Sequence, residues 1–324
     1  MSQSITTLGL QSSVNSNLAG GQKLLSQLTE QLTTGVYSSN LSDYTASDAQ
    51  KLLNVSSVLA EQQGFLDVIG TLDVRLKMYD STLTGVEDTI SEAYSSIISQ
   101  PTYEVNSAGA LQNQIAGYLD QMSYYLNQRV GDRYIYSGAR YSMEPVGDLS
   151  ALPVPPTETP PYLATGDTLP SYDAQYDSLD PLATMPAAYV KNSTAIDSSS
   201  TITYGINSNE TGFQQVIMGL RWAYAATQDP DNYSSYMQTA NTLLTDGTAN
   251  IRATHTGATN AYNRLQSAAT LISGNILSLK TQADDIAKID LNEVSIKITL
   301  LKTQLEASYS ATAILLKLSL SDYI

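Results

Sequence analysis

The clearest hydrophobic pattern in the chain lies near its C-terminus. Between residues 291 and 318, apolar positions recur at alternating steps of three and four, as in the seam of a coiled coil. The positions are Leu291, Val294, Ile298, Leu301, Leu305, Leu315 and Leu318, with Ser308 and Thr312 continuing the spacing. Since a single helix cannot bury such a stripe by itself, the pattern predicts a partner helix.

A matching stripe lies near the N-terminus. Its positions are Val14, Leu18, Gly21, Leu25, Leu28 and Leu32, and Gly35 follows as a C-cap. An ordinary amphipathic core helix would explain this stripe taken alone. The match to the C-terminal stripe favours a pairing of the two terminal helices, so we predict that both stripes form an assembly interface. Residues 1–13, rich in Ser, Thr and Gln, are expected to be loose on their own.

Long helices are predicted between the two ends. One begins near Ser47 and ends at Gln100, where Pro101 stops it, with Phe65 to Ile97 in unbroken four-three alternation. A helix over residues 108–130 should return antiparallel to it. Further helices are expected over residues 209–227 and from Asp229 to about residue 290, where the hydrophobic register slips before Leu291.

The middle of the chain has a different composition. Residues 144–187 contain nine prolines and accumulate acidic residues, which excludes a long helix. An acidic linker is one interpretation. We favour a small inserted domain, because Tyr162, Tyr172 and Tyr176 and the strand-like residues 201–206 are unusual in a disordered segment.

These patterns predict a mainly α fold: an elongated helical rod with paired N- and C-terminal coiled-coil helices and a small, β- and loop-rich inserted domain. The expected divisions are an N-terminal helix (1–40), a first part of the rod (41–143), the insert (144–205), a second part of the rod (206–290) and the C-terminal helix (291–324).

Composition narrows the possible functions. The 324 residues have a net charge of −15, so binding to nucleic acid is not expected. With no Cys, the chain has neither disulfides nor thiolate sites. Residues 1–30 lack the basic and apolar regions of an ordinary signal peptide, and no stretch is apolar enough to span a membrane.

Catalytic patterns are scarce. His255 is the single His, without identifiable catalytic partners, and is interpreted as a helix-surface residue. Asp229, Asp231 and Asn232 begin like a calcium loop, but Ser234 and Ala240 occupy the positions that need Gly and Glu, so a helix cap is the better interpretation. No phosphate-binding glycine loop occurs. We therefore expect no enzyme activity, no metal and no cofactor.

Several short motifs resemble one family. One segment resembles the R-Y-I-F-x-G motif of the hook–filament junction family (hook-associated protein 3) in the flagellin superfamily. It consists of Arg133, Tyr134, Ile135, Tyr136 and Gly138, and Tyr136 replaces the usual Phe. The turn Thr33–Gly35 and the ending 318–324 resemble the same family. Asn263, Arg264 and Leu265 resemble the N-R-L of flagellins, although the preceding Gly257 and Ala258 stand farther away than usual.

The resemblance implies a structural subunit of the bacterial flagellum that serves motility. The implied partners are further copies of the chain, the hook-side junction protein, flagellin and an export chaperone that holds the C-terminal helix. The implied location is extracellular, reached through the flagellar type III secretion route without a cleaved signal peptide.

Two other functions stay open at this stage. A filament-forming flagellin is one alternative, and the Arg133–Gly138 motif and the chain ending favour the junction role over it. A surface glycan-binding or adhesive module carried by the insert is the other, since planar Tyr side chains can stack on sugars.

Overall fold

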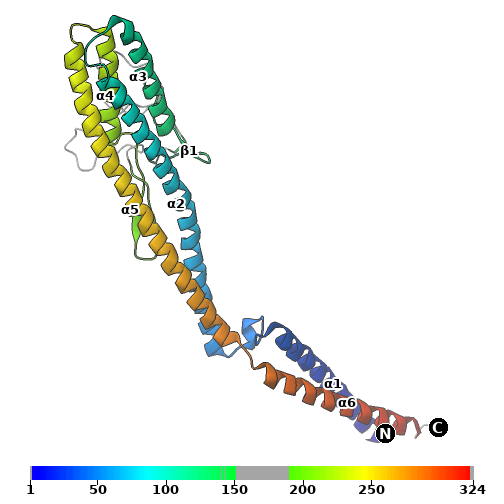
Figure 1. Ribbon diagram of the computed structural model, residues 1–324. Helices are drawn as coiled ribbons and strands as arrows, with labels where there is room; N and C mark the ends of the chain where they lie inside the picture. Colours follow the sequence, from blue (N-terminus) through cyan, green and yellow to red (C-terminus); the bar gives the residue numbers. More distant parts are fainter. Residues whose placement is uncertain (1, 140, 143, 151–189, 322–324) are drawn as a thin grey trace, which may run out of the picture. The chain divides into compact units, whose positions relative to one another are not determined.

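The computed structural model describes residues 2–139, 141–142, 144–150 and 190–321, and the side chains of residues 12–313 within these ranges. The described part is mainly helical, as predicted (Figure 1). Its helices are α1 (Ser2–Thr34), α2 (Ala46–Ile98), α3 (Val105–Leu126), α4 (Thr211–Gln228), α5 (Tyr233–Ala287) and α6 (Leu291–Ser321). Two small antiparallel hairpins pair β1 (Arg129–Val130) with β2 (Arg133–Tyr134) and β3 (Ser193–Ala195) with β4 (Thr201–Thr203).

The chain divides into two compact units, which are described separately. The terminal unit comprises the residues up to Gln62 and those from Gly274 onward, and the central unit comprises Gln63–Ser273. Helices α2 and α5, of 53 and 55 residues, each contribute to both units.

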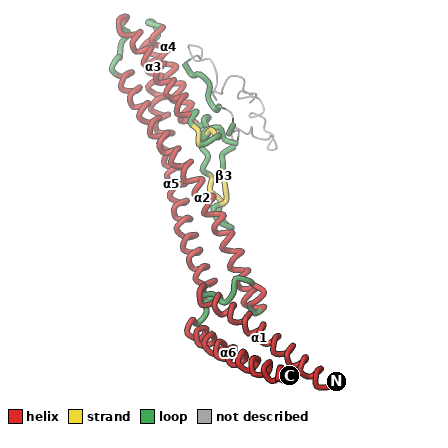
Figure 2. Tube along the Cα trace, turned by 90° about the vertical axis from the view of Figure 1, so that its right-hand side faces the viewer, coloured by secondary structure: helices red, strands yellow, loops and turns green. Residues whose placement is uncertain are grey.

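In the terminal unit, α1 and α6 pack against each other in antiparallel orientation. Figures 1 and 2 both show them side by side. Leu305 covers Gly21 so closely that a Cβ on Gly21 would lie 2.7 Å from Leu305 Cδ2. One residue further along α1, Gln22 Nε2 donates to Tyr309 Oη at 2.6 Å. The predicted pairing of the two terminal helices is therefore confirmed.

Two expectations for the terminal segments need correction. Helix α1 begins at Ser2, so the residues expected to be loose on their own are helical from Ser2 onward as part of the longer α1. Ser, Thr and Gln cost a helix only a few tenths of a kcal/mol each, about 0.7 kcal/mol at most. The register slip predicted near Asp290 is a complete break, because α5 ends at Ala287 and Asp290 Oδ1 accepts from Asn292 N at 2.8 Å to cap α6.

The two breaks in the terminal unit are hydrogen-bonded to each other. Gly35 ends α1 as predicted, with φ of +73° and its N–H bonded to Gln31 O at 2.8 Å. The next residues pair with the end of α5: Tyr37 N donates to Ala287 O at 2.7 Å, and Ile289 N donates to Gly35 O at 3.4 Å. Backbone bonds thus hold the α1–α2 connection against the α5–α6 connection.

In the central unit, α3 returns antiparallel to α2, as predicted. Thr89 Oγ1 donates to Gln121 Oε1 at 3.1 Å, and Ser96 Oγ lies 3.0 Å from Tyr118 Oη. The apolar stripe of α2 is buried from Ile69 to Ile97. The stripe of α3 is buried at Leu111, Ile115, Leu119, Met122 and Leu126. The four-three alternation therefore identified the buried faces of both helices.

Glycines bring α4 and α5 into close contact. A Cβ on Gly219 of α4 would lie 3.0 Å from Leu244 Cγ, and one on Gly247 of α5 would lie 3.0 Å from Val216 N. The buried face of this part of α5 is Tyr233, Met237, Ala240, Leu244 and Ile251. The sequence pattern predicts only a poor stripe here, and Ala240 is its one buried member; the stripe is Tyr236, Ala240, Leu243, Asn250, Ala253 and Gly257. Gly247 belongs to this buried face, but it has no side chain, so the hydrophobic pattern of the sequence does not register it.

Helix α5 begins later than expected. Its first residue is Tyr233, so Pro230 precedes the helix instead of lying in its first turn. Asp229 receives two hydrogen bonds from Asn232, one from the backbone N at 3.2 Å and one from Nδ2 at 2.8 Å. The bond from the Asn232 side chain is the main cause that lowers the pKa of Asp229. The Asp229–Asn232 segment is therefore a turn that leads into α5.

The described part of the insert comprises residues 144–150, where Val146 and Leu149 are buried, and a short hairpin. Strand β4 lies within the strand-like segment noted at residues 201–206, and β3 pairs with it in the register Thr194 to Ile202. Residues 151–189, including Tyr162, Tyr172 and Tyr176, lie outside the described residues. The predicted domain boundaries at 144 and 205 stay predictions.

The glycine contact between α4 and α5 leads to a first prediction. Gly247→Ala should destabilise the protein by about 1–3 kcal/mol, because its methyl group meets the α4 backbone and overpacks the contact. Gly257→Ala, on the same helix with open space around it, should instead stabilise by about 0.5–1 kcal/mol. Urea unfolding monitored by circular dichroism measures both. Equal effects of the two variants would contradict the close packing.

Candidate assembly surface and motif cluster

The predicted assembly residues occupy two different environments in the terminal unit. Leu28, Val294 and Leu305 are buried. Five more are half-buried: Val14, Leu18, Leu25, Ile298 and Leu301. The remaining described pair, Leu32 and Leu291, is exposed, at 40% and 47%. Leu315 and Leu318 lie outside the described side chains. Eight of the predicted residues are thus buried or half-buried in the terminal unit, and Leu32 and Leu291 lie on its surface.

A second apolar stripe on α6 points away from α1. Ile296 is 69% exposed and Leu300, one turn later, is 62% exposed. Sequence reasoning overlooked them because each lies two residues beyond a seam position, Val294 or Ile298, which places it on the other side of the helix. On α1, Leu24 is also exposed. We call Leu24, Ile296 and Leu300 the outer apolar residues.

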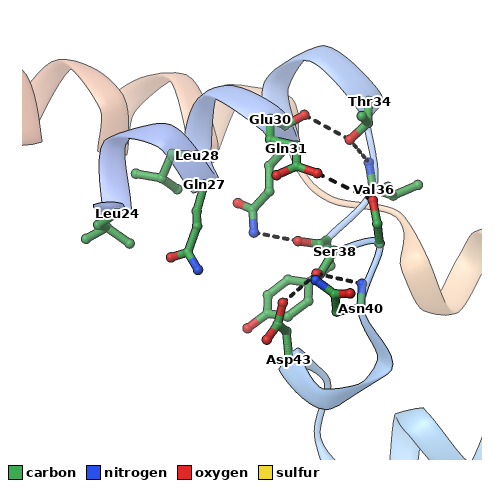
Figure 3. Close-up of a pocket in the computed structure, with 12 residues that line it drawn as sticks. Leu24, Gln27, Leu28, Glu30, Gln31, Thr34, Val36, Ser38, Asn40 and Asp43 are labelled. Carbon is green, nitrogen blue, oxygen red and sulfur yellow. Dashed lines mark hydrogen bonds between the residues drawn. The ribbon is translucent and has the colours of Figure 1, made fainter. Parts of the chain in front are cut away.

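Beside Leu24 the terminal unit has a surface hollow of about 210 Å³ (Figure 3). Leu24, Leu28 and Val36 contribute its apolar lining. The polar side is held by hydrogen bonds of the α1–α2 connection: Gln31 Nε2 donates to Tyr37 O at 2.7 Å, and Ser38 Oγ donates to Asp43 Oδ2 at 2.6 Å. The hollow is smaller than the 300–1,000 Å³ usual for small-molecule sites, and its shape suits a single protruding side chain.

The Arg133–Gly138 segment forms the second cluster. Arg133 and Tyr134 make β2, and Gly138, with φ of +58°, turns the chain after it. The next two residues of the motif, Ile135 and Tyr136, are buried. The structure therefore confirms a short strand and turn, although the strand is only two residues long.

Tyr136 joins this segment to two helices. Its ring lies edge-on against Tyr79 of α2, at 5.2 Å between centroids, and against Phe213 of α4, at 5.5 Å. Its hydroxyl lies 2.6 Å from Thr82 Oγ1. This contact explains the departure from the family's Phe, because Thr82 supplies the polar partner that a buried Tyr hydroxyl needs.

Tyr79 connects the segment to the chain that follows the insert. Its hydroxyl donates to Ile135 O and accepts from Ile206 N at 3.3 Å. Burial raises the pKa values of both Tyr79 and Tyr136 well above the ordinary range, so both stay neutral. The sequence showed Tyr79 only as one position of an apolar stripe, and its bonds span 56 and 127 residues.

Arg133 and its neighbours stabilise the outer side of the turn. The Arg133 guanidinium lies 4.1 Å from the centre of the Tyr141 ring, and Tyr134 N donates to Tyr141 O at 2.8 Å. In the other predicted motif, Leu265 is buried in the central unit, while Asn263 and Arg264 are exposed. Asn263 lines a hollow of about 410 Å³ together with Lys77 and Asp80.

The structure corrects the interpretation of His255. Instead of being a helix-surface residue without partners, it is half-buried, and its two ring nitrogens face Glu87 Oε1 at 2.7 Å and Asp80 Oδ1 at 2.9 Å. Since carboxylates occupy both nitrogens, neither nitrogen is available to activate a hydroxyl nucleophile. Within the described ranges no cluster of three or more His, Cys, Asp or Glu side chains is arranged to hold a metal ion.

No helix in the described part of the chain combines the length and the hydrophobicity that a membrane crossing needs.

One part of the chain matches a known family. Residues 237–324 match the bacterial flagellin C-terminal helical region, which covers α6 and nearly all of α5. The resemblance to the flagellin superfamily predicted from the sequence is therefore confirmed over this segment. No curated protein sequence matches the chain.

Among solved structures, one shares its helical fold. A protein from Vibrio parahaemolyticus, assigned as a flagellar hook-associated protein, has a TM-score of 0.60 at 14% identity, covering 76% of this chain and 100% of that one. FlgL of Bacillus cereus has a TM-score of 0.47 at 15% identity, covering 66% of this chain and 98% of that one.

The tyrosine contacts lead to a second prediction. Tyr79→Phe should cost about 1–3 kcal/mol, because it leaves buried backbone groups of Ile135 and Ile206 without their partner. Tyr136→Phe should cost less, about 0.5–1.5 kcal/mol, since Thr82 Oγ1 keeps its bond to Met78 O at 2.9 Å. Exposed Tyr124 is the control site for a Tyr-to-Phe change. Urea unfolding would refute the assignment if Tyr136→Phe proved the more harmful.

Proposed function

We propose that the chain is a structural subunit of the bacterial flagellum, with the role of the hook–filament junction protein, and that the α1–α6 pair is its assembly element. The observation that supports this most is the apolar surface of the α1–α6 pair. Two helices alone leave these side chains exposed to solvent. The flagellin-type C-terminal region includes one of these two helices, α6.

The terminal unit has little core of its own. Among its described side chains, the buried apolar ones are Leu28, Leu52, Ile276, Val294 and Leu305. Its exposed large apolar side chains are Leu24, Leu32, Tyr37, Leu41, Leu53, Val58, Leu277, Leu291, Ile296, Leu300 and Tyr309. Exposed apolar residues that lie next to each other, as Ile296 and Leu300 do one turn apart on α6, are typical of a surface that another protein covers.

Assembly with copies of the chain and with other axial proteins would cover this surface. The outer apolar residues are available for contacts between subunits, while the residues buried between α1 and α6 keep the pair together. The 210 Å³ hollow beside Leu24 has the size to receive an apolar side chain of a neighbouring subunit.

The junction role is favoured over a filament-forming flagellin by the Arg133–Gly138 motif. We further propose export through the flagellar type III secretion route to an extracellular position, with a chaperone covering α6 before export. Electron microscopy of the concentrated protein tests the role. Persistent monomers, together with a null strain that secretes unpolymerised flagellin, are expected for a junction protein, whereas long helical filaments would identify a filament flagellin.

The outer apolar residues lead to a third prediction. Ile296→Asp or Leu300→Asp should abolish motility in a complemented null strain, because a charge would have to be buried between subunits. Melting temperature should barely change, as both side chains are exposed in the isolated protein. Ser295→Asp adds the same charge at an exposed position about 100° around the helix from Ile296 and should preserve motility. Normal motility of both apolar variants would overturn the assembly surface.

The residues between α1 and α6 lead to a fourth prediction. Leu28→Asp and Leu301→Asp should each block assembly, because a charge in the contact separates the two helices. The central unit should keep its thermal unfolding transition, since its core lies in Gln63–Ser273. A large loss of this transition in both variants would show that the terminal helices belong to the main core.

Truncation tests the same contact. Deleting Leu305–Ile324 removes Leu305 from above Gly21 and should leave a soluble protein that cannot assemble. Flagella built from the truncated chain would exclude the pairing as a requirement.

A further inference from the structure

A histidine bound between two carboxylates connects α5 to α2 within the central unit. His255 of α5 lies with Nδ1 2.7 Å from Glu87 Oε1 and with Nε2 2.9 Å from Asp80 Oδ1, both on α2. Asp80 and Glu87 are seven residues apart, so they lie two turns apart on the same face of the helix. The imidazole is therefore held between them.

Hydrogen-bond chemistry determines how many protons the His255 ring carries when it bonds both carboxylates. An ionised carboxylate only accepts, and a neutral imidazole has a single N–H. A neutral His255 could bond one carboxylate, but the lone pair of its other nitrogen would face the second. The doubly protonated imidazolium donates to both, so the observed geometry fits the charged form alone.

We propose that His255 is a pH-operated clamp, which fastens α5 to α2 when protonated by donating to Asp80 and Glu87 and releases one of these carboxylates when it loses a proton. The proton leaves from Nδ1 or Nε2 to water, and the released carboxylate becomes solvated.

The surrounding charges support this assignment. From α2, Asp80 and Glu87 face the ring, and Lys77, one turn before Asp80, is paired with Asp73 at 2.7 Å. From α5, Arg252 Nε lies 3.7 Å from Glu87 Oε2. Asp80, Glu87 and Arg252 together carry one net negative charge, which the His255 proton neutralises. Loss of the proton therefore leaves an excess negative charge in the contact.

The clamp requires that the pKa of His255 be raised by its surroundings. Partial burial by itself lowers the pKa of His255, but the hydrogen bonds and charges of Asp80 and Glu87 outweigh it, so the pKa lies above its ordinary value. A group whose pKa is raised by folding contributes stability that is complete below its unfolded pKa, about 6.5. That stability is lost as the pH rises through the folded pKa.

Two hollows border the clamp. Asp80 lines the hollow of about 410 Å³, and Glu87 and Arg252 line another of about 370 Å³. The buried residues Leu83 and Val86 of α2 lie between these carboxylates in sequence and remain in the core. Release should consequently loosen the surface contact between α2 and α5 without unfolding either helix.

Nuclear magnetic resonance of the full chain tests the clamp directly, because the chain has a single His and its ring signals need no assignment. The wild-type pKa should exceed 6.5, and ring ¹⁵N shifts below it should show both nitrogens protonated. Asp80→Asn and Glu87→Gln should each lower the pKa, and the double variant should lower it most. Glu92→Gln, an exposed carboxylate on the same helix, is the matched control. A wild-type pKa at or below 6.5 would overturn the proposal.

A second measurement does not depend on the carboxylate variants folding. The equilibrium constant for urea unfolding should rise at least about threefold more between pH 6 and pH 9 in the wild type than in His255→Gln, because only the wild type loses the clamp. Equal pH dependence in the two proteins would show that the histidine does not contribute to the contact.

Discussion

The terminal unit depends on the close contact between Leu305 of α6 and the bare backbone at Gly21 of α1. A Cβ on Gly21 would lie 2.7 Å from Leu305 Cδ2, the flexible end of that side chain, so Leu305 would have to shift to make room for it. Leu305 thus packs directly on the α1 backbone, where it is itself buried. Only a few side chains are fully buried there. The same thinness leaves Ile296 and Leu300 facing outward, and it makes the pair suitable for contacts with other subunits.

The central unit is organised around a pair of buried tyrosines. Two buried tyrosines, Tyr79 and Tyr136, pack on each other, and Tyr136 also packs on Phe213. The Tyr136 hydroxyl bonds Thr82, and the Tyr79 hydroxyl bonds the backbone on both sides of the insert. The chain therefore leaves and re-enters the helical core at one well-packed place. The short Arg133–Gly138 segment has a structural role in this arrangement, which accounts for a motif without chemically reactive side chains.

These features agree with the assembly role that we propose. The flagellin-type C-terminal region and the exposed apolar surface of the terminal unit both support it. The central unit contributes a stable core, while the His255 clamp makes one of its helix contacts responsive to pH. Assembly surface and clamp lie in separate units, so each can be tested without disturbing the other.

The sequence by itself determined the helices, their buried faces and the pairing of the two ends, because a stripe with steps of three and four is a local property of the chain that requires burial. It misplaced the buried face of α5 near Gly247, where close approach replaces apolar bulk. Only the tertiary structure decided which groups meet: the Tyr79 bonds, the Tyr136–Thr82 contact and the carboxylates around His255 join residues 54 to 175 positions apart. Such contacts depend on how helices pack side by side, and hydrophobic periodicity along one helix contains no information on which polar groups of another helix will face it.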